Sequence, residues 1–380
     1  MNINKIDRRL LNEISILNSE KKTFCFVFGR DFCKTKALLE QKKVHIENVY
    51  LFINCFLCKA SQKEIFSLSN VEAVDYIYSL SVANALMYVS KKIISADKVA
   101  GYGDGVGVAF IDTGVAPHAD FLIGKNRVAF FKDFVAGKKN MYDDNGHGTF
   151  VCGVCSGCGV MSKFRYSGVA PKSTIFALKA LDGKGEASAN KILDAMEWLF
   201  ANHKKHNIKV VCMSFGSEPL GVNDPIMLGA DALWKEGVVV VAAAGNSGPE
   251  YQTIKSPGIS GKIITVGGID DNRIDDSHFK KEYFEMAKFS SRGPALRHVK
   301  PDLVAPSVDI ISCGIKKLYT TLSGTSVAAP MIAGVVALLV EKHEEYTPNQ
   351  IKNLLLKVCQ PLGFEINQEG FGLPNLSRLD

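Results

Sequence analysis

The sequence predicts two domains: a large α/β domain with three layers around a mainly parallel sheet, and a small α+β domain before it. The chain has 380 residues, enough for one large and one small domain. From near Ile93 onward, short apolar runs alternate with longer segments suited to helices, whereas residues 1–86 contain shorter elements in another order. We therefore divide the chain into residues 1–86 and 87–380.

The small domain is predicted to contain three strands and two helices, because its apolar runs are short and partly alternating. A domain of this size buries little core, so we expect it to be better ordered when docked on a partner surface. In chain order, the strands are 24–28, 49–56 and 71–78, and the helices are 35–42 and 64–68.

The strands of the large domain are continuous apolar runs, as expected for strands covered on both faces. Their alternation with helices predicts a parallel sheet, whose active site lies at the carboxyl ends of the strands. The predicted strands are 106–111, 174–178, 210–213, 238–243 and 263–266, and the predicted helices are 147–156, 188–205, 225–235, 327–344 and 348–358.

Composition is that of an ordinary globular protein, with 47% hydrophobic and 22% charged residues. A net charge of +6 without a concentrated basic patch argues against nucleic acid as a partner. Residues 1–22 are polar, and we find no run of about 18 apolar residues, so neither a signal peptide nor a membrane span is predicted. We expect a cytoplasmic protein, although loss of a leader stays open.

The ten cysteines are expected to be reduced thiols, since no secretory signal is predicted. The spacing of Cys152, Cys155 and Cys158 resembles a metal motif. However, no fourth ligand with suitable spacing is evident, and cysteines in a buried helix usually act as small hydrophobic side chains. We therefore predict no metal at these three residues.

Ser326 lies between the turn Leu322-Ser323-Gly324-Thr325 and the apolar run 331–340. This places a hydroxyl at a helix N-terminus, where negative charge is stabilised. The small neighbouring residues leave room for a substrate backbone. Alternatively, Thr325 or Ser326 is simply a helix cap.

Three further residues occupy strand ends or helix starts of the same domain: Asp112 ends a strand, His147 begins a helix, and Asn246 follows a strand. Each has an ordinary alternative as a turn or structural residue. Together with Ser326 they supply a carboxylate, an imidazole, an amide and a hydroxyl. Those are the parts of an acyl-transfer site with an oxyanion hole.

In chain order and in their surroundings, these residues resemble the triad motifs of subtilisin-like serine proteases, the subtilases. The resemblance covers about residues 87–378, and it implies the subtilisin-like three-layer fold. Further motifs that carry it are Gly168-Val169-Ala170-Pro171, Met213-Ser214-Phe215-Gly216, Phe289-Ser290-Ser291-Arg292-Gly293, 300–306 and Gly370-Phe371-Gly372-Leu373.

The resemblance implies a serine endopeptidase. Ser326 would attack the scissile carbonyl, His147 would be its base, and Asp112 would orient the imidazole. The Asn246 side chain and the Ser326 backbone N–H would bind the oxyanion.

The resemblance also places an extended polypeptide substrate between two walls of the large domain, as an added strand. One wall contains Gly183, Lys184 and Gly185, and the other contains Ser214, Phe215 and Gly216. Ser247 would lie by the main specificity pocket and carries no charge, so an apolar or neutral substrate residue is expected there.

Residues 1–86 resemble a subtilase propeptide, a small ferredoxin-like domain that assists folding and inhibits the active site. Self-cleavage is expected after Leu86, with any bond between Leu80 and Ser95 open. An ordinary N-terminal interaction domain is the alternative. Two other readings of the whole protein also stay open: a dormant protease that retains its propeptide, as in spores, and a peptide-binding regulator. Non-classical export would also fit.

The sequence departs from the family pattern at two places near the triad. Phe150 replaces the usual histidine after Gly148-Thr149, which is no triad position. Residues 157–166 usually form a calcium loop rich in asparagine, but here they carry no carboxylate and two cations. Calcium requires oxygen ligands, so we expect this site to be lost and predict no cofactor. A calcium site elsewhere stays open.

Overall fold

The computed structural model describes residues 2–16, 20–51, 54–79, 87–272 and 281–379, in two compact units. The first unit contains Met1–Asn84 together with Asn272–Tyr283. The second contains Ala85–Asp271 and Phe284–Asp380. Leu86, after which cleavage is predicted, lies outside the described residues.

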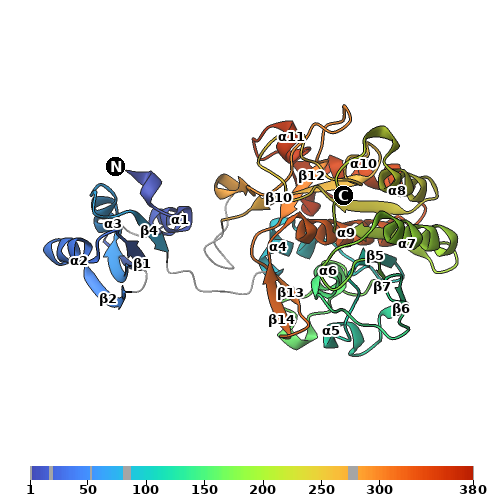
Figure 1. Ribbon diagram of the computed structural model, residues 1–380, viewed down its shortest axis with the longest axis horizontal. Coiled ribbons are helices and arrows are strands. Elements are labelled where there is room, and N and C mark those ends of the chain that lie inside the picture. Colours follow the sequence, from blue (N-terminus) through green and yellow to red (C-terminus); the bar gives the residue numbers. More distant parts are fainter. Residues whose placement is uncertain (1, 17–19, 52–53, 80–86, 273–280, 380) are drawn as a thin grey trace. The chain divides into compact units, whose positions relative to one another are not determined.

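Unit 1 is a four-stranded antiparallel sheet with helices (Figure 1). Its strand order is β2-β3-β1-β4. The elements are α1 (Arg8–Ile16), β1 (Lys22–Phe28), α2 (Phe32–Gln41), β2 (His45–Tyr50), β3 (Cys55–Ser61), α3 (Gln62–Ser69) and β4 (Tyr76–Ser79). Its core contains Leu10 and Ile14 of α1 together with Val27, Phe56 and Ile77 of the sheet.

Two strand predictions for this unit were wrong, and one helix was missed. The strand predicted at 71–78 begins only at Tyr76, where β4 starts, and residues 71–75 form no strand. Residues 49–56 are not one strand, because the chain turns between β2 and β3, and Asn54 adopts a φ of +49° there. Helix α1 was not predicted, although Leu10 and Ile14 lie one turn apart and are both buried.

Unit 2 is built on an eight-stranded sheet. Its main order is β11-β10-β9-β8-β5-β7-β6, with β12 also paired to β10. All pairings are parallel except that of β10 with β11. The strands are β5 (Gly107–Asp112), β6 (Val128–Asp133), β7 (Thr174–Lys179), β8 (Ile208–Met213), β9 (Val239–Ala243), β10 (Ile264–Asp270), β11 (Glu285–Met286) and β12 (Leu303–Pro306).

Helices flank this sheet, which gives the predicted three-layer α/β architecture (Figure 1). Helix α6 packs on α9, and α7 packs on α8. The helices are α4 (Met87–Ile93), α5 (Ala119–Leu122), α6 (His147–Ser156), α7 (Ala189–Asn202), α8 (Pro225–Lys235), α9 (Thr325–Lys342), α10 (Pro348–Lys357) and α11 (Ile366–Glu369). Two small antiparallel pairs complete the unit: β13 (Ile310–Cys313) with β14 (Tyr319–Leu322), and β15 (Cys359–Gln360) with β16 (Leu373–Pro374).

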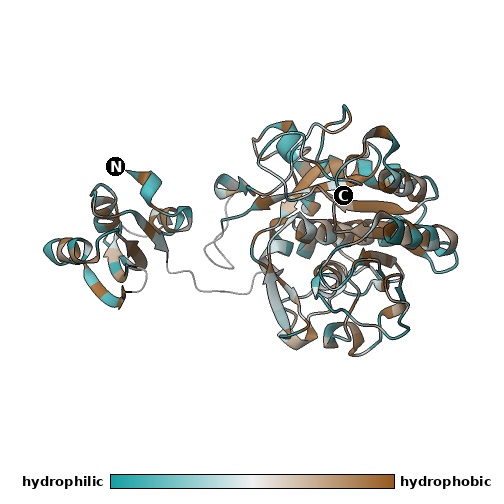
Figure 2. Ribbon diagram, in the orientation of Figure 1, coloured by the Kyte–Doolittle hydropathy of each residue, from teal (hydrophilic) through white to brown (hydrophobic). Residues whose placement is uncertain are grey.

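The apolar strands of the large sheet, coloured mostly brown in Figure 2, form the core of unit 2. Every residue of β5 and β9 is buried. Helix α9 is long and apolar enough to cross a membrane, with a mean hydropathy of 1.5, but 83% of that window is buried inside the protein. This burial is typical of a core helix.

Candidate active site

Four predicted residues lie where strands of the large sheet end or where its helices begin. Asp112 is the last residue of β5, and Asn246 follows β9 by three residues. His147 is the first residue of α6, and Ser326 is the second residue of α9, which packs on α6. The carboxyl ends of parallel strands and the N-termini of the following helices meet at one edge of such a sheet.

Asp112 and His147 form a direct pair. The Nδ1 atom of His147 lies 2.8 Å from Oδ1 of Asp112. The same oxygen accepts the backbone N–H of Thr113 at 2.7 Å. Asp112 is buried, and its Oδ2 atom has no hydrogen-bond partner within the part of the chain that the structure describes.

This pair changes the proton affinity of His147, whose side chain is 24% exposed. Burial alone lowers the pKa of a histidine, but the charge and hydrogen bond of Asp112 and the charge of Asp143 outweigh it. The pKa of His147 is therefore raised above its ordinary value of 6.5. An imidazole held in this way has Nε2 available for proton transfer.

Asp143, which sequence reasoning missed, holds the loop before His147. Its Oδ1 accepts the Thr113 hydroxyl at 2.9 Å and the backbone N–H groups of Asn145 and Gly146 at 3.1 and 2.8 Å. Its Oδ2 accepts the backbone and hydroxyl of Thr149 at 2.9 and 2.7 Å. The carboxylate thereby joins the residue after Asp112 to the start of α6. The sequence did contain a signal for this role, because Asp143 precedes the predicted catalytic His147 by only four residues.

Lys179 is a second residue that sequence reasoning missed. Its side chain is fully buried at the end of β7, where it is in register with Asp112. The Nζ atom donates to Asp144 at 2.7 Å and to the carbonyl oxygens of Thr113 and Leu181 at 2.6 and 2.9 Å. The ammonium group therefore joins the loops that follow β5 and β7 to the loop before His147.

Ser326 is not the cap of its helix. The N-cap of α9 is Gly324, which makes no side-chain cap bond, so the alternative of Thr325 or Ser326 as a simple cap was wrong. A Cβ atom built on Gly324 would lie 3.1 Å from the Ser326 Oγ and 3.2 Å from the Asn246 Nδ2. The serine hydroxyl and the asparagine amide therefore face the same small space.

Asn246 has its orientation set by Thr325. Its Oδ1 accepts both the backbone N–H and the hydroxyl of Thr325, each at 2.9 Å. This leaves the donor Nδ2 on the side toward Ser326, and a flipped amide would lose the bond from the Thr325 backbone N–H, which can only donate. Among the hydrogen bonds of residues that the structure describes, none joins His147 to Ser326.

The two predicted substrate walls have different conformations. Gly183, Lys184 and Gly185 lie in an exposed turn rather than a strand, where Asp182 accepts the Lys184 N–H at 2.9 Å. The Asn145 side chain also donates to Gly183 at 3.2 Å. On the other side, the residues directly after β8 change from buried to exposed. They are Ser214, Phe215 and Gly216.

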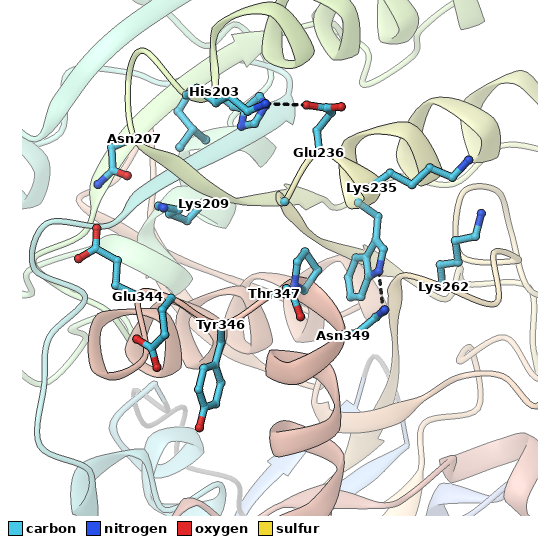
Figure 3. A pocket seen from close by; sticks show the side chains of 16 residues that line it. His203, Asn207, Lys209, Lys235, Glu236, Lys262, Glu344, Tyr346, Thr347 and Asn349 are labelled. Atoms are coloured by element: carbon cyan, nitrogen blue, oxygen red, sulfur yellow. Dashed lines mark hydrogen bonds and ion pairs between the residues drawn. The ribbon is translucent and has the colours of Figure 1, made fainter.

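A pocket of about 780 Å³ lies elsewhere, at the amino ends of β8, β9 and β10, and thus at the opposite edge of the sheet. Figure 3 shows side chains of both charges around it, including Lys209, Lys262, Glu236 and Glu344. Lys204 and Glu236 already pair at 2.8 Å. None of the predicted catalytic residues lines this pocket.

The segment 157–166, where the family resemblance places a calcium loop, has no carboxylate side chain of its own. The Ser162 hydroxyl donates to Gly159 at 2.8 Å and accepts the Tyr166 N–H at 2.9 Å. The segment thus closes through its own hydrogen bonds, and calcium needs six to eight oxygen ligands.

A serine, a paired histidine and aspartate, and an amide donor thus lie at strand ends and helix starts of one three-layer α/β unit. This is the arrangement expected of a serine peptidase. Residues 103–373 match the sequence model of the protein family described as "Subtilase family", and the chain belongs to this family.

Individual relatives agree with this assignment. The chain is 34% identical over 348 residues to Serine protease AprX of Bacillus subtilis, covering 84% of this chain and 77% of that protein. It is 34% identical over 281 residues to Subtilisin DY of Bacillus licheniformis, covering 71% and 90%.

Solved structures show the same fold. Sphericase matches with a TM-score of 0.65 and 26% identity over 77% of this chain and all of that chain (100%). S41 Psychrophilic Protease matches with a TM-score of 0.64 and 27% identity, covering 76% and 97%. The protein is a subtilisin-like serine endopeptidase that acts on polypeptides.

Proposed function

We propose that this endopeptidase cuts peptide bonds through Asp112, His147 and Ser326, by way of an acyl-enzyme. The observation that supports this most directly is the 2.8 Å contact between His147 Nδ1 and Asp112 Oδ1. This contact keeps a proton on Nδ1, so Nε2 is the atom that accepts a proton. It also stabilises the imidazolium once that proton is taken up.

In this mechanism, the Ser326 Oγ attacks the scissile carbonyl carbon while His147 takes the hydroxyl proton. The C–N bond then breaks, and His147 gives that proton to the leaving amine. Water attacks the resulting ester, loses a proton to His147, and releases the carboxyl product as the proton returns to Ser326. The Asn246 Nδ2 and the Ser326 N–H bind the oxyanion at both stages.

The chain's own N-terminal part is the first substrate that we propose. Residues 1–86 would act as a propeptide that assists folding, is cut after Leu86, and then inhibits as a bound strand between Gly183–Gly185 and Ser214–Gly216. The small antiparallel sheet of unit 1, with helices α1 to α3, supports this role because it forms its own core.

The test compares the masses of wild type and Ser326→Ala after expression. Two fragments in wild type, with the smaller ending near Leu86, and one intact chain in the variant are expected. An intact wild-type chain contradicts self-processing. Failure of wild type to react with a fluorophosphonate contradicts a nucleophilic Ser326 and supports a peptide-binding regulator.

A third outcome distinguishes a dormant enzyme. If wild type is cut but the two fragments co-purify and label slowly, the propeptide remains bound as an inhibitor. Separation of the fragments in urea followed by removal of the smaller one would then increase labelling.

A further inference from the structure

A buried cluster of metal-ligating side chains lies in unit 2 apart from the proposed triad. His118, Asp120 and Cys313 each place one ligand atom within 4.8 Å of the others. Their exposures are 6%, 0% and 0%. A second thiol lies beside this group of three: the half-buried Cys158 places its Sγ 3.9 Å from Asp120 Oδ1, while the Cys313 Sγ lies 3.8 Å from Oδ2.

Although the sequence spacing around Cys158 predicted no metal there, we propose that His118, Asp120, Cys158 and Cys313 bind one zinc ion or a similar borderline-soft divalent cation. A tetrahedral zinc site has bonds of about 2.0–2.3 Å, which place neighbouring ligand atoms roughly 3.3–3.8 Å apart. The two measured sulfur–oxygen distances are already close to that spacing. Because the two sulfur atoms lie near different carboxylate oxygens, four-coordinate binding through one oxygen requires a small rotation of the Asp120 carboxylate.

The surroundings of the cluster supply the outer bonds that such a site needs. The His118 Nε2 lies 2.6 Å from the carbonyl oxygen of Leu318, a contact of the kind that orients metal-binding histidines. Its Nδ1 accepts the Asp120 N–H at 3.1 Å, and metal binding at Nδ1 replaces this one bond. Asp120 is held by the Tyr319 hydroxyl at 2.7 Å and the Met161 N–H at 3.2 Å.

The charges also balance when a divalent ion is bound. The guanidinium group of Arg127 is buried nearby and donates to the backbone oxygens of Asp120 and Ser156. With zinc, three positive charges face the carboxylate and two thiolates.

The position of the cluster gives the ion a structural role. It joins three segments: α5 with the residues before it, the segment 157–166, and the hairpin of β13 and β14. The second strand of that hairpin ends at Leu322, four residues before Ser326. A thiolate and imidazole site would therefore hold the segment 157–166 against α5 and this hairpin.

The test uses full-length Ser326→Ala, which cannot digest itself, kept reduced and free of chelators. Titration with cobalt(II) should give a thiolate-to-metal charge-transfer band that saturates at one ion per chain, and zinc should abolish the band. Cys158→Ser combined with Cys313→Ser should remove the band, whereas Cys33→Ser, at an exposed thiol, should leave it unchanged.

Alkylation of the unsubstituted cysteines in this Ser326→Ala chain provides a readout that does not depend on the folding of a cysteine variant. Zinc should slow the reaction of Cys158 with iodoacetamide, because a metal-bound thiolate is no longer a free nucleophile, while Cys33 reacts at the same rate with and without zinc. No stoichiometric cobalt band, a band that persists in a folded double variant, or equal alkylation of Cys158 with and without zinc would overturn the proposal.

Discussion

At the scale of single residues, Asn246 is oriented by two hydrogen bonds to Thr325, and its amide donor lies toward Ser326. We expect Asn246→Ala to lower kcat by about 10²–10³ with little change in KM, because it removes an oxyanion donor. That magnitude is the one known for the corresponding residue of subtilisin itself and is not an independent estimate. Steady-state kinetics on a peptide anilide would measure it.

The matched control is Asn126→Ala, which changes another exposed asparagine away from Ser326. Wild-type kinetics are expected for that control. A rise in KM with an unchanged kcat for Asn246→Ala would show a role in ground-state binding only.

The raised pKa of His147 predicts the pH dependence of the enzyme. Catalysis needs the neutral imidazole, so kcat/KM should rise with pH and reach half its maximum above pH 6.5. Asp112→Asn removes the carboxylate charge, so the midpoint should shift to lower pH while kcat falls by about 10⁴, as known for a serine protease of another fold. A wild-type midpoint below 6.5 would contradict the pairing.

The same shift determines how His147 affects stability. Because the folded protein binds this proton more tightly, protonated His147 stabilises the fold below pH 6.5, and this contribution is lost as the pH rises through the raised pKa. Activity is therefore highest above the raised pKa of His147, whereas this stabilising contribution is largest below it.

At the scale of elements, Asp143 connects the end of β5 with the start of α6. Asp143→Ala leaves donors of Thr113, Gly146 and Thr149 without their acceptor, so we expect about 3 kcal/mol less free energy of unfolding. Urea unfolding of each protein in the Ser326→Ala background would measure this. The exposed Asp104→Ala serves as the control.

This stabilisation should also depend on pH. Burial by itself raises the pKa of Asp143, but the hydrogen bonds of Gly146 and Thr149 lower it below 3.8. The difference between the Ser326→Ala chain with Asp143 intact and Asp143→Ala should be complete above pH 3.8 and shrink as the pH falls through the lowered pKa. A difference that grew on acidification would contradict this account.

Gly324 controls the approach of Ser326 to Asn246. A methyl group there would crowd both side chains, at 3.1 and 3.2 Å, and the residue has a φ of +152°. We expect Gly324→Ala to lower kcat/KM at least about 100-fold through displacement of reacting groups. Gly363→Ala is the control, since Gly363 has a φ of +96° but open space around its Cβ position.

Comparison of the two variants separates crowding from backbone strain. Gly363→Ala should lose stability without losing kcat/KM. Equal kcat/KM for Gly324→Ala and wild type would show that the two side chains do not need this spacing.

At the scale of the whole molecule, unit 1 has its own core, in which Phe56 is fully buried. Phe56→Ala should cost about 3–5 kcal/mol in this unit. If unit 1 assists folding, fewer molecules should become active on refolding, while each active molecule keeps wild-type kcat. Active-site titration with a fluorophosphonate counts them, and the exposed Leu51→Ala is the control.

The larger unit was predicted well because its strands are continuous buried runs and its helices follow them in regular alternation. Strand β6 was missed because it is an edge strand, with only Asp133 buried. In unit 1, the strand predicted at 49–56 was wrong because apolar residues continue through the turn at Asn54. Periodicity does not separate an apolar turn from a strand.

The sequence by itself determined the family and the four residues of the proposed site. Ser326, His147, Asp112 and Asn246 lie in short motifs whose small neighbours and order are very specific. These site residues can be predicted from sequence because each one needs a strand end or a helix start, which a few adjacent residues define.

Only the tertiary structure decided what surrounds those groups. Asp143, Lys179 and Asp120 each have a partner distant in the chain, and no local pattern predicts which residue that partner is. The physical reason is burial: a carboxylate or ammonium group out of water must find partners, and chain folding alone determines which groups lie close enough to bond with it.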